Sequence, residues 1–167
     1  MRTMIRIAAV AVLLFAAVGA FAQNGDTLNI GGQVPLRLEL TVTADANADN
    51  LTLLAGGADA TANATIATID ITTNNTDGWE LWLFSANADG VNAGIENADG
   101  DRITYTVTYA GAGGVATTNL TSAGLAVGES AANLDQAAQL LSIDYLQSDA
   151  HNAGYYSDQL AIVLRAK

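Results

Sequence analysis

The sequence predicts an all-β fold, an antiparallel β-sandwich of about seven to nine short strands with at most one short helix. Apolar and polar residues alternate over several short runs, the pattern of strands with one buried face. Clusters of Asn, Asp, Thr and Gly separate these runs and have the chemistry of turns. The chain holds 16 Gly and a single Pro, which also favours many short turns between strands.

The N-terminus has the features of a secretory signal peptide, which we place at residues 1–22. Arg2 and Arg6 form a basic start, Ile7–Val18 is almost wholly apolar, and Ala20-Phe21-Ala22 supplies a small-x-small cleavage site. The apolar stretch is shorter than the roughly 20 residues that span a bilayer. We therefore expect a secreted protein, extracellular, at the cell surface or in the periplasm, with no transmembrane segment after cleavage.

A long alternating run, Leu28–Val42, follows the signal peptide. Gly31-Gly32 and Pro35 interrupt it, and such residues weaken or exclude strand pairing. We therefore expect an N-terminal extension or first strand at residues 23–34 and a sandwich domain at residues 35–167. The apolar face of the extension carries Leu28, Ile30 and Val34. This extension pairs either with its own domain or, as a donor strand, with a neighbouring copy.

The first strands of the domain alternate clearly. Leu36–Thr43 places four apolar residues on one face, and the Ala/Asp/Asn run Ala44–Asn50 ends it as a turn. Ala64–Thr73 alternates again, and Asn74–Gly78 is a dense turn signal. These residues predict two strands, each bounded by a turn.

The most hydrophobic strand is predicted at Trp79–Ser85, which is apolar on both faces and is therefore expected to be central. A long polar loop, Asn87–Asp101, follows it. Arg102–Tyr109 alternates cleanly beyond that loop. The simplest arrangement pairs these two strands with each other in antiparallel fashion.

The rest of the chain gives a weaker pattern until its end. We expect a strand at Val115–Thr121, a short helix within Glu129–Leu141 from the spacing of its apolar residues, and a strand at Leu141–Leu146. The last strand lies within Tyr155–Arg165. Short strands separated by turns, with almost no helix, indicate an immunoglobulin-like antiparallel β-sandwich.

The C-terminal strand carries a resemblance to a known family. Residues 154–162 resemble the Gly-x-Tyr-x-Asp-x-Leu-x-Val pattern that closes domains of the spore coat protein U family and the archaic chaperone-usher pilins. Gly154, Tyr156 and Asp158 match that pattern residue by residue. The resemblance implies an immunoglobulin-like sandwich that lacks its last strand and is completed, in a fimbrial fibre or pilus, by the N-terminal extension of the next subunit. One departure is the absence of cysteine, which those pilins usually carry as a pair near the mature N-terminus.

Charge and composition limit the partners and the chemistry. The net charge of −11 repels nucleic acid, so we expect no nucleic-acid partner. With no cysteine, neither disulfides nor thiolate metal sites are available. His151 is the only histidine and has the setting of an exposed loop residue, so a histidine-based triad lacks material. We expect no enzyme activity and no catalytic residues, the remaining enzymatic alternative being a secreted hydrolase that uses two carboxylates.

Calcium is the one cofactor for which the sequence offers a candidate site. Glu96, Asp99 and Asp101 lie within one predicted acidic turn, and oxygen ligands of this kind suit calcium. The other interpretation is a solvated acidic turn without an ion. We expect no cofactor, with calcium at this turn as the alternative.

A binding surface is predicted on the Trp79–Ser85 strand. If Trp79, Leu81 and Leu83 face the core, the other face presents Glu80, Trp82 and Phe84. Exposed aromatic side chains suit stacking on a sugar or contact with a subunit. Alternatively, the predicted helical turn near Leu134 covers them.

Two functions therefore stand as hypotheses. The first is a structural subunit of an extracellular or cell-surface fibre, pilin-like or coat-like, in which the N-terminal segment is added as a strand to another copy or another surface subunit. The alternative is a monomeric secreted or surface adhesin, a β-sandwich module that binds carbohydrate.

Overall fold

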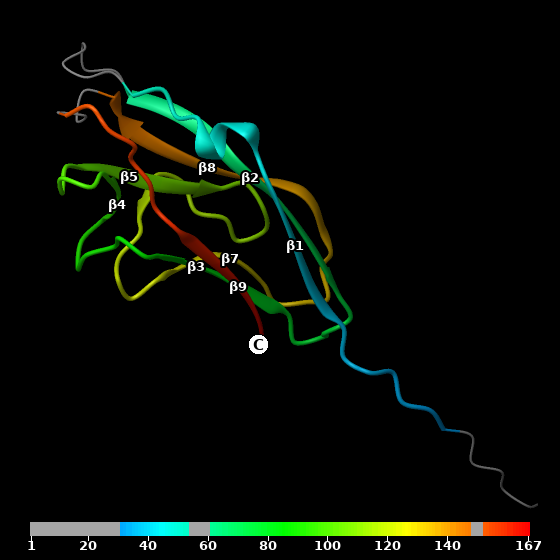
Figure 1. Ribbon diagram of the computed structural model, residues 1–167. Helices are drawn as coiled ribbons and strands as arrows, with labels where there is room; N and C mark the ends of the chain where they lie inside the picture. Colours follow the sequence, from blue (N-terminus) through cyan, green and yellow to red (C-terminus); the bar gives the residue numbers. More distant parts are fainter. Residues whose placement is uncertain (1–30, 54–60, 148–151) are drawn as a thin grey trace, which may run out of the picture. The chain divides into compact units, whose positions relative to one another are not determined.

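The predicted all-β sandwich is confirmed. A computed structural model describes residues 31–53, 61–147 and 152–167, and these form nine strands in two antiparallel sheets (Figure 1). The chain divides into two compact units, Met1–Val34 and Pro35–Lys167, and all nine strands belong to the second. The predicted signal peptide lies outside the described residues.

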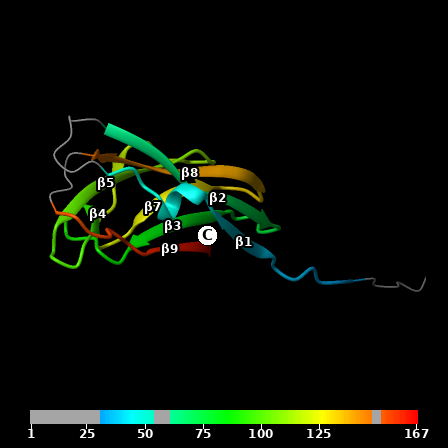
Figure 2. The same cartoon turned by 45° about the horizontal axis from the view of Figure 1, so that its top comes forward.

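The larger sheet has six strands, in the order β1-β2-β8-β5-β4, with β6 paired to β5. The smaller sheet has three, in the order β7-β3-β9 (Figure 2). The strands of the larger sheet are β1 (Leu38–Ala44), β2 (Thr61–Thr73), β4 (Ala93–Glu96), β5 (Arg102–Tyr109), β6 (Thr118–Asn119) and β8 (Gln136–Leu146). Those of the smaller sheet are β3 (Trp79–Ser85), β7 (Leu125–Ser130) and β9 (Leu160–Ala166). A single turn of 3-10 helix, Ala46–Asp49, follows β1.

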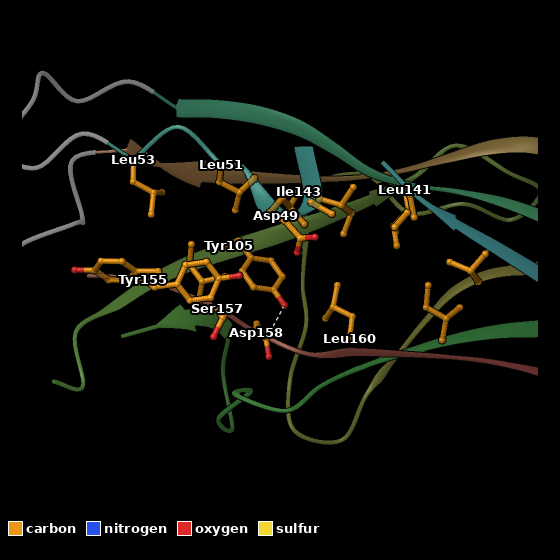
Figure 3. Close-up of a pocket in the computed structure, with 18 of the residues that line it drawn as sticks. Asp49, Leu51, Leu53, Tyr105, Leu141, Ile143, Tyr155, Ser157, Asp158 and Leu160 are labelled. Carbon is orange, nitrogen blue, oxygen red and sulfur yellow. Dashed lines mark hydrogen bonds between the residues drawn. The ribbon is translucent and has the colours of Figure 1, made fainter. Parts of the chain in front are cut away.

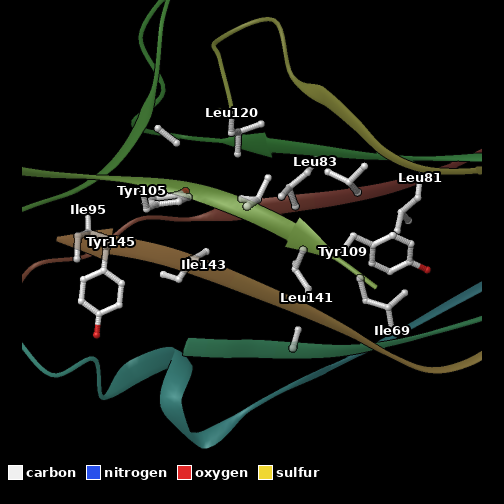
Figure 4. Packing of buried hydrophobic residues seen from close by; sticks show 14 of the residues in the cluster. Ile69, Leu81, Leu83, Ile95, Tyr105, Tyr109, Leu120, Leu141, Ile143 and Tyr145 are labelled. Atoms are coloured by element: carbon white, nitrogen blue, oxygen red, sulfur yellow. The ribbon is translucent and has the colours of Figure 1, made fainter. Parts of the chain in front are cut away.

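The core lies between the two sheets and uses every second residue of the central strands. Trp79, Leu81 and Leu83 of β3 have no exposed surface. Opposite them, β5 and β8 contribute a cluster of apolar side chains (Figure 4). These residues are Ile103, Tyr105, Val107, Tyr109, Leu141, Ile143 and Tyr145. The alternation in the sequence therefore corresponds to the face that each strand buries.

The bounds predicted for β3 and β5 agree with the structure, but the predicted pairing between them is wrong. β3 pairs with β7 and β9, whereas β5 pairs with β8, β4 and β6 in the opposite sheet. Between β3 and β4 the chain crosses from the smaller sheet to the larger one. β3 and β5 therefore lie on opposite sides of the core, and each turns a buried apolar face toward it.

The predicted helix within Glu129–Leu141 is also wrong, because this segment contains the end of β7 and the start of β8. β8 is a central strand that pairs with both β2 and β5. Its register against β2 shifts near Ala138, which has a left-handed φ of 53° and donates its N–H to Asp70. An irregularity of this kind breaks the two-residue alternation, and the remaining apolar spacing then imitates a helix.

Two further strands were not expected from the sequence. β4 lies inside the predicted polar loop, and β7 lies in the stretch where the pattern was weak. β9 begins at Leu160, later than the predicted Tyr155. Before it, Ser157 makes an isolated antiparallel bridge to Glu96 at the edge of β4. The chain thus contacts the larger sheet immediately before it enters the smaller one.

Candidate functional site

A groove of about 490 Å³ lies between β9 and the inner face of the larger sheet (Figure 3). Most of its lining residues are apolar, and they come from six segments of the chain that are separated in the sequence. Representative residues are Val42, Leu51, Ile66, Ile143, Leu160 and Ile162. Its polar lining residues include Tyr105, Ser157 and Asp158.

Two edge strands border this groove. Within the described part of the chain, β1 pairs only with β2, and β9 pairs only with β3. Each strand therefore has one edge whose main-chain N–H and C=O groups are free for a further strand.

The register identifies the residues at these free edges. Asp45 N–H donates to the Ile66 carbonyl, and Ala86 N–H donates to the Gln159 carbonyl. Hydrogen-bonded and non-hydrogen-bonded pairs alternate along an antiparallel ladder. It follows that the free edges are formed by the alternate residues Leu40, Val42 and Ala44 of β1 and Leu160, Ile162 and Leu164 of β9. These are the residues whose apolar side chains face inward.

The inward side chains along the groove are incompletely covered. Val42 is 42% exposed and Leu160 and Ile162 are half-buried, whereas Leu81 and Leu83 on the neighbouring strand β3 have no exposure. Inward-facing apolar residues of a closed sandwich are normally buried. The groove therefore has the free backbone edges and the uncovered apolar surface that one additional strand would satisfy.

Asp158 lies in the groove lining and joins both sheets. Its carboxylate accepts hydrogen bonds from the Tyr105 hydroxyl at 2.5 Å, the Ser85 hydroxyl at 2.6 Å and the Asn87 N–H at 3.2 Å. Burial, together with the carboxylate of Asp158, raises the pKa of Tyr105 far above its ordinary value, so this hydroxyl stays a donor. Asp158 thereby fastens the start of β9 to β3 and β5.

Tyr156 fastens the same segment from the other side. Its ring is 9% exposed, and its hydroxyl donates to the Asn152 carbonyl at 3.0 Å. The Asn152 side chain in turn donates to Asp101 at 2.5 Å. The Tyr-x-Asp pair of the C-terminal pattern therefore holds the wall of the groove in place. Gly154 lies beside Asn97 and also borders the groove.

The predicted binding surface is assembled as one cluster on the outer face of the smaller sheet. The rings of Trp82 and Phe84 stack with centroids 6.2 Å apart, and the Trp82 Nε1–H donates to Glu80 at 3.0 Å. The guanidinium of Arg165 lies 5.0 Å from the Trp82 ring and 5.8 Å from the Phe84 ring. Arg165 covers the rings, rather than the helical turn predicted near Leu134.

Two of the three carboxylates of the calcium candidate contact protein groups. Glu96 lies 3.6 Å from the Arg102 guanidinium, Asp101 accepts from Asn152, and Asp99 is exposed. In the described residues no group of three or more His, Cys, Asp or Glu side chains is arranged to hold a metal ion.

The structure describes only part of the donor-strand candidate. Val34 is 80% exposed, whereas Leu28 and Ile30 lie outside the described residues. His151 lies outside them as well. No helix within the described ranges is long and apolar enough to cross a membrane.

Sequence reasoning missed two features of these sites. The sequence pattern predicts Arg165 only as the end of a strand. Its place over the aromatic rings follows from its pairing opposite Glu80 in β3. The groove itself was not expected in this form, because Leu51, Ile66 and Ile143 belong to separate segments. The signal that was available is the matched alternation of Leu36–Thr43 and Tyr155–Arg165, whose apolar faces border it.

No family model matches the chain, and the search of the curated proteins gives no match.

Proposed function

We propose that this chain is a structural subunit of an extracellular or cell-surface fibre, assembled by β-strand addition. In this proposal the N-terminal segment, residues 23–34, of one copy enters the groove between β1 and β9 of the next. The observation that supports it best is the groove itself, with two strand edges that pair with no other described strand and inward apolar residues that the described chain leaves uncovered. Main-chain hydrogen bonds would supply affinity, and Leu28, Ile30 and Val34 would fill the groove.

Deletion of residues 23–32 tests this function. The deleted protein should remain a soluble domain and should no longer assemble, which light scattering and negative-stain microscopy measure. A matched control replaces the polar face of the segment, Asn29→Ser with Gln33→Ser, and should still assemble. Assembly by the deleted protein would show that this segment is not the donor.

A peptide of residues 23–34 gives a second test of the same groove. Added to the deleted protein, it should raise the melting temperature in a concentration-dependent manner, because a ligand that binds only the folded state stabilises that state. A peptide with Leu28→Asp and Ile30→Asp should have no effect.

The alternative function, a monomeric adhesin that binds carbohydrate, draws support from the stacked Trp82 and Phe84 rings on the outer face of the smaller sheet. Glycan-array binding that is lost in Trp82→Ala would favour it. Fibres seen by microscopy in the purified protein would count against a monomeric module.

A further inference from the structure

One side chain holds the three residues that precede β1. Asn74 Nδ2 donates to the Pro35 carbonyl at 2.8 Å, and Asn74 Oδ1 accepts from the Arg37 N–H at 2.6 Å. The Asn74 N–H also donates to the Arg37 carbonyl at 3.1 Å. These three bonds extend the β1–β2 ladder past its last strand pair, Leu38 with Thr73, and keep Pro35 and Arg37 in line with β1.

The contact made by Asn74 lies at the end of the sandwich where β1 begins and β9 ends. Leu38 is paired with Thr73, Ala166 is paired with Trp79, and the short β2–β3 turn joins Thr73 to Trp79. The β1 residues that line the groove, Val42 and Ala44, lie further along β1, away from this end. To enter the groove of its own domain, the chain before Pro35 would have to reverse direction.

Asn74 opposes a reversal next to β1. Its bonds hold Pro35 and Arg37 extended alongside the end of β2. A tight turn at these residues would take them out of the extended conformation and would break both side-chain bonds.

A reversal further upstream would place the apolar face wrongly. A two-residue loop at Gly31-Gly32 would set Ile30 opposite Gln33 and Leu28 opposite Pro35. Both apolar residues would then lie before Leu38, the first residue of β1, and short of the groove lining at Val42. A segment from a second copy has neither restriction.

We propose that Asn74 is a positioning residue that keeps the N-terminal segment out of its own groove and so directs it to a second copy of this chain. The inference rests on the proposed function, in which this segment is the donor strand. What it adds is a residue, Asn74, that makes the segment bind another copy and not its own domain.

The test compares three full-length variants with the wild-type chain by light scattering. Asn74→Ala removes both side-chain bonds, whereas Asn133→Ala removes an exposed asparagine side chain that makes no hydrogen bond with the described residues. The third variant inserts Gly-Ser-Gly-Ser between Val34 and Pro35, which permits a reversal while the Asn74 contact stays intact. The insertion variant keeps Asn74. If it also gives more monomer, a folding defect caused by Asn74→Ala is not the explanation.

We expect the monomer fraction to rise several-fold in Asn74→Ala and in the insertion variant, and to be unchanged in Asn133→Ala. The new monomers should melt at a higher temperature than the protein lacking residues 23–32, because their own segment fills the groove. Monomers that melt no higher than that deletion variant would have an empty groove and would overturn the inference.

Failure of this inference and failure of the proposed function give different results. If the wild-type chain assembles through residues 23–32, but both the Asn74 variant and the insertion assemble like Asn133→Ala, the positioning role is wrong and strand addition stands. If deletion of residues 23–32 leaves assembly unchanged, strand addition itself fails, and the role of Asn74 fails with it.

Discussion

At the scale of single residues, two polar groups at the core show opposite states. Asp158 is half-buried and is an acceptor shared by donors from both sheets. The Tyr109 hydroxyl, in contrast, is buried and has no hydrogen-bond partner among the described residues. A satisfied group and an unsatisfied one have opposite consequences for stability when they are removed.

Asp158→Asn should lower the free energy of unfolding by about 2–3 kcal/mol. Tyr105 and Ser85 donate to one carboxylate oxygen, and the N–H groups of Asn87 and Gln159 donate to the other. An amide has only one oxygen, and its NH2 group cannot accept the second set of bonds. Chemical denaturation measures this change. Asp77→Asn, in an exposed turn, is the control and should change little. An equal effect of the two substitutions would contradict the role of Asp158 as a link between the sheets.

Tyr109→Phe should leave the free energy of unfolding unchanged or raise it by up to about 1 kcal/mol, since the hydroxyl it removes is desolvated without a bond. Burial also raises the pKa of Tyr109 to about 12, whereas an unfolded tyrosine titrates near 10. The folded state therefore holds this proton more tightly, and the resulting stability is complete below pH 10 and lost as the pH rises toward 12.

Denaturation curves collected between pH 9 and pH 12 test this pH dependence. The wild-type protein should lose stability more steeply over this interval than Tyr109→Phe. Tyr155→Phe, which changes a tyrosine that is 72% exposed, should follow the wild-type curve. Identical slopes for all three proteins would disprove the contribution of Tyr109.

At the scale of elements, β9 has two different faces and one free edge. Ile162 faces the groove, and its neighbour Val163 faces outward on the opposite side of the sheet. The same substitution at these adjacent positions therefore separates an effect on the groove from an effect on the strand.

Ile162→Glu should abolish assembly, because it places a charge on the apolar lining, whereas Val163→Glu should assemble like the wild-type chain. Light scattering measures assembly, and circular dichroism checks that both variants retain the β-sheet spectrum. Normal assembly by a folded Ile162→Glu variant would mean that the groove is not the acceptor.

At the scale of the whole molecule, acidic residues far outnumber basic ones. The net charge is −11, and three of the cations in the domain are paired internally: Arg37 with Glu39, Arg102 with Asp89, and Lys167 with Glu129. The fourth, Arg165, lies over the aromatic rings of β3. Two approaching copies therefore repel each other over most of their surface.

The rate of assembly should consequently increase several-fold as sodium chloride is raised from about 0.01 M to about 0.15 M, because the screening length shortens from about 30 Å to about 8 Å. Time-resolved light scattering measures this rate. Calcium chloride at matched ionic strength separates screening from specific binding of the cation. A rate that does not depend on salt would show that charge repulsion does not limit association.

How far the sequence alone leads can be judged from particular strands. The bounds of β3 and β5 and the buried faces of both follow from alternation, a local property that any strand with one buried face must have. The same argument failed at β8, where the irregularity at Ala138 removes the alternation and only pairing with β2 and β5 makes the segment a strand. For the candidate site, Trp82 and Phe84 were predicted to share a face, but Arg165 above them was not.

Periodicity and composition are local properties, and they are enough to predict an all-β chain with an excess of acidic residues and a C-terminal Tyr-x-Asp strand. The folded chain is needed to see which strands pair, that β1 and β9 border a groove, that Asp158 joins the two sheets, and that Asn74 holds the residues before β1. These features depend on residues far apart in the chain, such as Pro35 with Asn74 and Tyr105 with Asp158. Which distant residues meet depends on packing the whole core at once, and a local pattern does not contain that information.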